Sequence, residues 1–229
     1  MAGLGQRFTE KYTVPKPLID VHGKTMIKRV VENFGDLNSY IFIVLKKHEE
    51  QFQISKRLKS LCIENKIIIT DGVTEGPAAS CLLAEEYLNN DPLLIVNCDQ
   101  IIEDFSWKNF NSFIRWKNPD GVLGVFSSNH PKNSYVKLDE SFKITEVKEK
   151  MVISSLATNG LHFWKNANDF VNSAKSMIEN NERYNNEFYV GPSFNYLINK
   201  SKVILPYYFN QHIPIGTPQD LEIYEQSIR

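Results

Sequence analysis

Hydrophobic and polar residues alternate along the first half of this chain in a way that predicts strands separated by helices. Apolar runs such as Ile41-Phe42-Ile43-Val44-Leu45 and Leu93-Leu94-Ile95-Val96 are typical of buried strands. In Met26 to Phe34 the apolar residues instead recur at helical spacing. The predicted order is helix 26–34, strand 39–45, helix 48–61, strand 66–70, helix 77–88, strand 93–96, helix 105–116 and strand 121–126.

The second half changes character, because its apolar runs are separated by short turns. The pattern predicts strands at 135–138, 144–148, 157–164 and 202–206, and helices at 169–179, 188–198 and 218–228. Strands alternating with helices in the first half imply a doubly wound, mostly parallel sheet. We therefore expect an α/β fold, with a single domain spanning residues 1–229.

Composition narrows the class of protein. The 229 residues are 42% hydrophobic, enough for a full core, and 26 basic against 27 acidic residues give a net charge of −1. This balance gives no electrostatic reason to expect nucleic acid as a partner, and the apolar runs are too short to cross a membrane. Cys62, Cys81 and Cys98 are scattered, which favours neither zinc nor disulfides and fits the cytoplasm. The sequence leaves a homo-oligomer open.

The chain opens with its most informative motif, Met1-Ala2-Gly3-Leu4-Gly5-Gln6-Arg7-Phe8, followed by Val14-Pro15-Lys16-Pro17-Leu18. Glycines allow a backbone to approach a phosphate closely, and their amides can line an anion-binding concavity. Arg7 and Lys16 would add two cations for a triphosphate. A bare G-x-G can equally be an ordinary tight turn, and the order differs from that of a P-loop or a dinucleotide fold.

The compound pattern GxGxRF…PKPL resembles the fingerprint of the sugar-phosphate nucleotidylyltransferases. The resemblance implies a GT-A-like nucleotide-diphospho-sugar transferase fold and nucleotide binding through the residues of the motif. In that family a short apolar strand precedes the fingerprint, and we expect such a strand upstream of Met1. The nucleotide-binding residues predicted in the motif are Ala2, Gly3, Leu4, Gly5, Arg7 and Lys16.

Asp99 lies just beyond the apolar strand 93–96, at the edge where open α/β sheets bind ligands. A carboxylate there can hold Mg²⁺ together with phosphate oxygens, although an aspartate can also simply turn a loop. The resemblance implies the metal-binding role. Many relatives carry a second metal aspartate where this chain has Pro214, so a second carboxylate is Asp220, Glu187 or absent.

The segment Thr74 to Ser80 opens the helix before that strand, and in the family it lies against base and ribose. Of its residues, Glu75, Gly76 and Ala79 are predicted to bind the nucleotide. The Glu75 carboxylate can accept from an exocyclic amine such as cytosine N4, which points to CTP. The alternative is a solvated glutamate that is favoured by the helix dipole.

The resemblance places the acceptor on the second half of the chain. Lys148-Glu149-Lys150 matches the family's Glu-Lys pair, which assigns the acceptor phosphate to Lys150 and an acceptor hydroxyl to Glu149. The family's proline is replaced by Met151, and a solvated charged turn is the alternative. Asn159, Gly160 and Glu187 lie in segments that resemble the acceptor pocket of the branch associated with capsular polysaccharide synthesis.

With the roles that the resemblance implies, these residues predict a Mg²⁺-dependent transfer in which an acceptor phosphate attacks the α-phosphorus of a nucleoside triphosphate and pyrophosphate leaves. The predicted catalytic residues are Arg7, Lys16, Asp99 and Lys150, which bring two anions together and stabilise the spreading charge. The acceptor is a sugar 1-phosphate or another small phosphorylated metabolite. Two alternatives remain: a glycosyltransferase of the same fold, and an inactive nucleotide-binding regulatory homologue.

Overall fold

The computed structural model describes residues 1–35, 39–61, 64–102 and 105–227. Its contacts divide the chain into two compact units, each built from more than one stretch. Unit 1 comprises Met1–Thr74, Cys98–Ser106 and His212–Arg229, and unit 2 comprises Glu75–Asn97 and Trp107–Gln211. The single domain over residues 1–229 stays a prediction.

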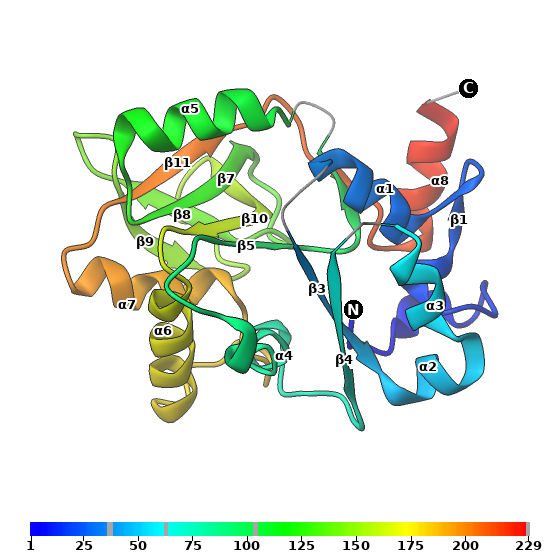
Figure 1. The fold of residues 1–229 in the computed structure, drawn as a ribbon. Helices are drawn as coiled ribbons and strands as arrows, with labels where there is room; N and C mark the ends of the chain where they lie inside the picture. The colour runs from blue at the N-terminus through cyan, green and yellow to red at the C-terminus, as the bar shows by residue number, and fades with distance from the viewer. Residues whose placement is uncertain (36–38, 62–63, 103–104, 228–229) are drawn as a thin grey trace. The chain divides into compact units, whose positions relative to one another are not determined.

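Unit 1 joins the N-terminal signature to the C-terminal end of the chain. Its core packs Phe8, Ile19 and Met26 against Ile215 and Leu221, which come from the last stretch of sequence. Strands β3 and β4 form a parallel pair, and β6 pairs with β12 in antiparallel register. The elements of unit 1 are η1 (Gln6–Phe8), η2 (Lys16–Leu18), β1 (Asp20–Val21), β2 (Lys24–Thr25), α1 (Met26–Phe34), β3 (Tyr40–Leu45), α2 (Lys46–Phe52), α3 (Ile54–Lys59), β4 (Asn65–Thr70), β6 (Gln100–Ile101), β12 (Ile213–Pro214) and α8 (Pro218–Ser227) (Figure 1).

The helix predicted at 48–61 is two helices, α2 and α3. Gln53 separates them, because its φ of +47° lies in the left-handed region that ends a helix. The Glu49 carboxylate then accepts from the backbone N–H of Ser55, at 2.8 Å, and so satisfies a donor in the first turn of α3. The hydrophobic spacing alone gave no sign of this break.

Unit 2 is built on a six-stranded sheet with the order β11-β7-β10-β8-β9, in which β5 also pairs with β10. Strands β7 and β11 are parallel, and β10 is antiparallel to β5, β7 and β8. The elements of unit 2 are α4 (Pro77–Leu82), η3 (Glu85–Tyr87), β5 (Leu93–Val96), α5 (Trp107–Lys117), β7 (Gly121–Ser127), β8 (Tyr135–Leu138), β9 (Ile144–Lys148), β10 (Leu156–Trp164), α6 (Ala167–Glu179), η4 (Gly191–Ser193), α7 (Phe194–Asn199) and β11 (Ile204–Tyr208).

The α/β class is confirmed, but the sheet is mixed. Since β10 runs opposite to both β5 and β7, those two strands share one direction with β11, as the alternating first half predicts. The long strand β10 comes from the second half of the chain and lies between β5 and β7. Most ladders of this sheet are therefore antiparallel, which corrects the mostly parallel sheet of the prediction.

Two neighbouring aromatic residues of β10 show how the sheet acquires helices on both faces. Successive side chains of a strand point to opposite faces. Trp164 stacks on Phe194 of α7, with ring centroids 4.3 Å apart, and also packs against Phe170 of α6. Phe163 instead packs edge-on against Phe110 of α5. Figure 1 shows α5 along one face of this sheet and α6 and α7 along the other.

Two predicted helices of unit 2 are shorter than expected. The segment 188–198 becomes helical from η4 onward, because the backbone N–H and C=O of Phe188 are already bonded to Glu75 and Ala78. The segment 77–88 is α4 followed by the short turn η3. The strand predicted at 202–206 begins at Ile204, because the Asp120 carboxylate takes the N–H of Val203.

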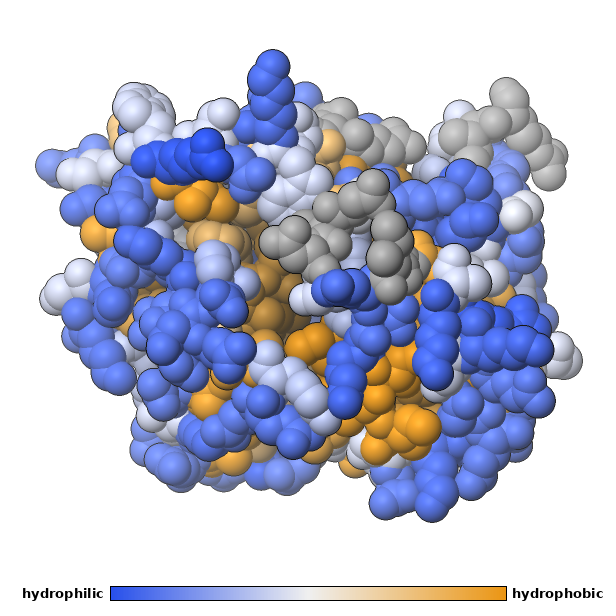
Figure 2. Space-filling view, viewed as in Figure 1, coloured by the Kyte–Doolittle hydropathy of each residue, from blue (hydrophilic) through white to orange (hydrophobic). Residues whose placement is uncertain are grey.

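On the face seen in Figure 2, hydrophilic residues predominate, with hydrophobic residues interspersed among them. Around β4 of unit 1, Ile69 and Val73 are 50% and 54% exposed. Among the described helices, none combines the length and the apolar character that a membrane crossing requires.

Candidate functional site

The signature loop of unit 1 folds tightly against Lys16. Gly5 has a φ of +64°, and a Cβ at this position would lie 3.2 Å from the Lys16 Cβ. A side chain is therefore disfavoured at Gly5 both by the backbone conformation and by the lack of space. The carbonyl of Gly5 accepts from the N–H of Phe8, whose ring is buried in the core of unit 1. The core thus fixes the loop that the sequence predicted to bind phosphate.

Lys16 and Asp99, which are 83 positions apart in the sequence, meet in unit 1. The Lys16 ammonium donates to Asp99 Oδ2 at 2.5 Å and to the carbonyl of Gly216 at 3.2 Å. The two side chains are 17% and 32% exposed, so the pair is partly shielded from water. The backbone carbonyl of Asp99 accepts from the N–H of Ile215 at 2.9 Å, next to the pairing of β6 with β12.

Gly216 completes this group. A Cβ there would stand 3.2 Å from Asp99 Oδ2 and 3.8 Å from the Lys16 Nζ. A larger residue would press on the ion pair, so the glycine keeps room around both charged groups. The sequence analysis assigned no role to Gly216.

The other signature residues do not share the contacts of Lys16. Arg7 is exposed and lines a separate hollow of about 400 Å³ in unit 1. Ala2 is buried and packs against Ile43 and Leu45 of β3. Gly3 and Leu4 are exposed, and a Cβ on Gly3 would have no described residue within 4 Å other than its chain neighbours. The hollow beside Arg7 is lined by Gln6, Arg7, Glu10, Lys11, Thr217, Pro218, Gln219 and Glu222.

Asp99 is the residue of unit 1 that fits a metal role. Within the described residues no three acidic, histidine or cysteine side chains gather as a ligand cluster. Magnesium commonly takes one or two carboxylates and completes its shell with phosphate oxygens and water, so the single half-buried carboxylate of Asp99 is sufficient. Asp220 instead lies in the first turn of α8, where its N–H donates to Thr217 Oγ1 at 3.1 Å.

The segment around Gly76 in unit 2 is clamped by the backbone of Phe188. The N–H of Phe188 donates to the carbonyl of Glu75 at 2.8 Å, and the N–H of Ala78 donates to the carbonyl of Phe188 at 2.9 Å. Gly76 has a φ of +126°, and a Cβ there would lie 2.4 Å from the Phe188 nitrogen. Glycine is thus required at this position. Ala79 follows in α4 and is half-buried.

Glu75 has an ion-pair partner that sequence reasoning missed. Its Oε1 pairs with Arg183 Nη1 at 2.8 Å, and the guanidinium of Arg183 lies 4.2 Å from the centroid of the Phe188 ring. The Glu75 side chain is still 62% exposed. The segment around Gly76, which is predicted to bind the nucleotide, is therefore joined to the segment around Glu187 in two ways. One is the pair of backbone hydrogen bonds to Phe188, and the other is this ion pair.

Lys150 of unit 2 is held by tyrosines. Its ammonium donates to the hydroxyl of Tyr189 at 2.8 Å and lies 4.7 Å and 5.4 Å from the ring centroids of Tyr189 and Tyr184. The Tyr189 hydroxyl in turn donates to Glu187 Oε2 at 2.7 Å. The structure therefore brings together Lys150 and Glu187, both predicted for the acceptor, through a tyrosine that the prediction did not include.

Glu149 points to a different partner, since its carboxylate accepts from the Ser134 hydroxyl. Burial raises the pKa of the Glu149 carboxyl, and the Ser134 hydrogen bond and the Lys150 charge only partly oppose this. The N–H of Thr158 donates to the carbonyl of Ser134, and this bond ties Ser134 to the start of β10.

Asn159 and Gly160 form an irregularity in β10. The register with β7 shifts between Thr158 and His162, and Gly160 has a φ of +78°. Asn159 is 1% exposed, its Oδ1 accepts from the N–H of Leu161, and its Nδ2 has no hydrogen-bond partner among the described residues. A buried donor of this kind is available to a ligand that can reach it.

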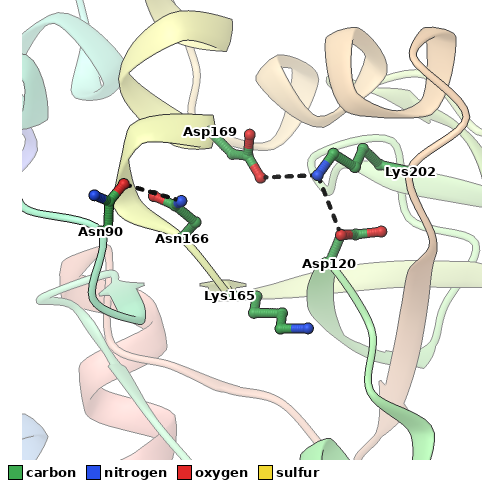
Figure 3. Close-up of a pocket in the computed structure, with 6 residues that line it drawn as sticks. All are labelled: Asn90, Asp120, Lys165, Asn166, Asp169 and Lys202. Carbon is green, nitrogen blue, oxygen red and sulfur yellow. Dashed lines mark hydrogen bonds and ion pairs between the residues drawn. The ribbon is translucent and has the colours of Figure 1, made fainter.

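Besides the hollow in unit 1, the structure has a depression of about 300 Å³ in unit 2. It lies away from all the residues predicted for the site. Figure 3 shows Lys202 between Asp120 and Asp169, at 3.3 and 3.7 Å from their carboxylates, and Asn166 beside Asn90. Its charged side chains neutralise one another. We interpret this cluster as a structural link between β7, β11 and α6.

Comparison with known proteins finds a family match over the first part of the chain. Residues 1–107 match the MobA-like NTP transferase domain, a range that contains the signature loop, Lys16 and Asp99. The bifunctional proteins GlmU of Methanocaldococcus jannaschii and Thermodesulfovibrio yellowstonii are 29% and 26% identical over 157 and 242 residues, covering 65% and 100% of this chain. The chain spans only 34% and 51% of those two relatives.

The fold agrees with this relationship. The crystal structure of the nucleoside-diphosphate-sugar pyrophosphorylase from Vibrio cholerae RC9 superposes with a TM-score of 0.85 at 22% identity, covering 99% of this chain and 98% of that one. The predicted relation to the nucleotidylyltransferases is thus confirmed. The capsular branch stays a prediction.

Proposed function

We propose that this chain, related over residues 1–107 to the MobA-like NTP transferases, joins a nucleoside triphosphate to a phosphorylated acceptor and releases pyrophosphate. One observation carries the proposal: Lys16 and Asp99, predicted separately from distant motifs, meet at 2.5 Å beside the glycine loop. A cation and a carboxylate side by side suit a polyphosphate, the first as its direct partner and the second as a ligand of its metal.

In this proposal the residues of unit 1 hold the triphosphate. Lys16 exchanges the carboxylate of Asp99 for phosphate oxygens, and Arg7 adds a second cation. Asp99 would hold Mg²⁺, which would supply positive charge at the α-phosphate. Because the acceptor phosphate is already anionic at neutral pH, the enzyme needs no strong general base. Its main tasks are to position two anions and to stabilise the charge that spreads in the transition state.

The residues of unit 2 select the substrates. Lys150 would contact the acceptor phosphate, and Glu149, Asn159 and Gly160 would line the acceptor. CTP is the triphosphate to test first, since the largely exposed carboxylate of Glu75 has one oxygen outside its pair with Arg183 and can accept from cytosine N4. A role in decorating capsule or surface polysaccharide follows from the sequence resemblance alone.

The test is pyrophosphate release. The protein is incubated with Mg²⁺, each of the four common triphosphates, and a panel of hexose 1-phosphates and small phosphorylated alcohols, amines and amino acids. One triphosphate–acceptor pair should release pyrophosphate. Lys16→Ala should lower its turnover by at least about a hundredfold, as for the loss of a group aimed at transition-state charge.

Lys24→Ala is the matched control, because Lys24 of unit 1 also forms an ion pair, with Glu32 at 2.8 Å, but lies outside the signature. It should keep its turnover within about twofold, as is usual for exposed pairs. Release of a nucleoside diphosphate from a nucleotide sugar would instead identify a glycosyltransferase. Triphosphate binding without turnover on any acceptor would identify a regulatory homologue.

A further inference from the structure

We propose that Tyr189 is a positioning residue, whose hydroxyl, anchored by Glu187, holds the Lys150 ammonium in place for the acceptor phosphate. This inference rests on the proposed function, since it takes Lys150 as the residue that contacts that phosphate. It also changes the role of Glu187, which the sequence assigned to the acceptor itself.

A tight turn fixes the anchor of this network. Tyr184 and Glu187 exchange two backbone hydrogen bonds of 3.0 Å, with Asn185 and Asn186 between them. Both asparagines have positive φ values, 48° and 64°, as in the type I′ turn of a two-residue hairpin. Asparagine tolerates this conformation better than most residues. The turn therefore sets Tyr184 and Glu187 at fixed positions on either side of it.

Three groups then form a directed chain of hydrogen bonds. The Lys150 ammonium donates to the Tyr189 hydroxyl, which has one proton of its own and donates it to Glu187 Oε2. Each bond polarises the next, so that the carboxylate strengthens the hydroxyl as an acceptor for the ammonium. Phenylalanine at position 189 would keep the ring and break both bonds.

The rings of Tyr189 and Tyr184 restrict the ammonium further. They lie within the distance at which an aromatic face attracts a cation, and they cover part of its surface. Lys150 itself has a φ of +48°, an uncommon conformation for a residue with a side chain. An ammonium has three donors, and the bond to Tyr189 occupies one. Two remain for the oxygens of a phosphate.

The position of Lys150 is thus set before the acceptor arrives. A free lysine would have to give up the mobility of its side chain on binding, and this network has already restricted it. Loss of the Tyr189 hydroxyl should consequently weaken acceptor binding more than it affects the triphosphate. This selective effect distinguishes a positioning role from a general role in folding.

The experiment compares Tyr189→Phe with the unmodified full chain. We expect the KM for the acceptor to rise about tenfold, as for one hydrogen bond to a charged group, with the KM for the triphosphate within about twofold. In a Lys150→Ala background, Tyr189→Phe should have no further effect, because the group it positions is gone. Equal and additive losses in both backgrounds would overturn the proposal.

Tyr196→Phe is the matched control, since it also removes a hydroxyl from unit 2 that accepts a hydrogen bond, here from Asn180 at 2.9 Å. It has no contact with Lys150 among the interactions of the described residues, and it should leave both KM values unchanged. A rise in the acceptor KM of this variant as large as that of Tyr189→Phe would assign the effect to general loosening of unit 2.

A second readout does not depend on turnover. The rate at which acetic anhydride labels Lys150, measured by peptide mass spectrometry, should rise severalfold in Tyr189→Phe and remain unchanged in Tyr196→Phe. If no triphosphate–acceptor pair reacts but labelling rises, the network holds Lys150 and the proposed function is wrong. If pyrophosphate is released but neither labelling nor the acceptor KM changes, the proposed function stands and the role of Tyr189 is refuted.

Discussion

Gly76 offers the sharpest test of how unit 2 is built. The substitution Gly76→Ala should substantially lower the free energy of unfolding of this unit. The residue has φ +126° and ψ 175°, a conformation that only glycine adopts readily. An alanine Cβ would lie 2.4 Å from the nitrogen and 2.6 Å from the oxygen of Phe188. Both contacts are with backbone atoms, so no side-chain rotation can relieve them.

The magnitude follows from what must move. Backbone strain at such a position costs about 1–3 kcal/mol. Shifting Phe188 also stretches its bonds to Glu75 and Ala78, each with a net value of about 0.5–1.5 kcal/mol, and disturbs a ring that is fully buried. We expect the free energy of unfolding to fall by about 2–5 kcal/mol, which is large for a domain of ordinary stability.

Tryptophan fluorescence during urea unfolding is the assay, because all three tryptophans of the chain, Trp107, Trp116 and Trp164, lie in unit 2. Gly191→Ala is the control, since its Cβ would make only ordinary contacts, at 3.5 Å to Val147 and 3.7 Å to His162. It should stay within about 1 kcal/mol of the parent protein. The reasoning is refuted if Gly76→Ala unfolds at the same urea concentration and with the same slope as the parent.

Two further predictions concern charge. Asp99→Asn should abolish Mg²⁺-dependent pyrophosphate release while barely changing the melting temperature, because the asparagine oxygen can still accept from Lys16; continued turnover with the same Mg²⁺ dependence would make Asp99 a loop residue. Burial lowers the pKa of His162 to about 4 from 6.5, so below pH 6.5 the unfolded chain binds a proton that the folded chain does not. Stability should therefore fall by up to about 3 kcal/mol as the pH drops from 6.5 to 4. The variant His162→Gln should lose this pH dependence of stability, and His130→Gln, at an exposed position, should keep it. If the free energy of unfolding changes equally with pH in the two variants, the assignment to His162 is refuted.

The spacing of apolar residues predicted most of the helices and strands, because an element with one buried face carries apolar residues at a regular interval. Helix 26–34 and strands 135–138 and 144–148 have the predicted bounds. The errors lie where a specific interaction overrides the pattern. Gln53 breaks a helix through its left-handed backbone, and the segment after Phe188 is kept from helix by its bonds to Glu75 and Ala78.

The sequence by itself also determined which residues belong to the chemistry of unit 1. Glycines and cations in a compound motif are recognisable without a structure, because backbone freedom and charge are properties of the residue types. Lys16 and Asp99 were each predicted alone. Only the tertiary structure decided that they touch, because their approach depends on how β6 pairs with β12 after more than a hundred intervening residues.

The partners of the predicted acceptor-binding residues could not be predicted from the sequence, for the same reason. Glu187 and Lys150 are 37 positions apart, and nothing in their local patterns indicates that Tyr189 connects them. A hydrogen bond depends on distances of about 3 Å, whereas hydrophobic periodicity fixes only which face of an element is buried. The residue types determine what chemistry this chain can perform. The packing of β9 and the turn at 184–187 determine that Tyr189 bonds to both Lys150 and Glu187.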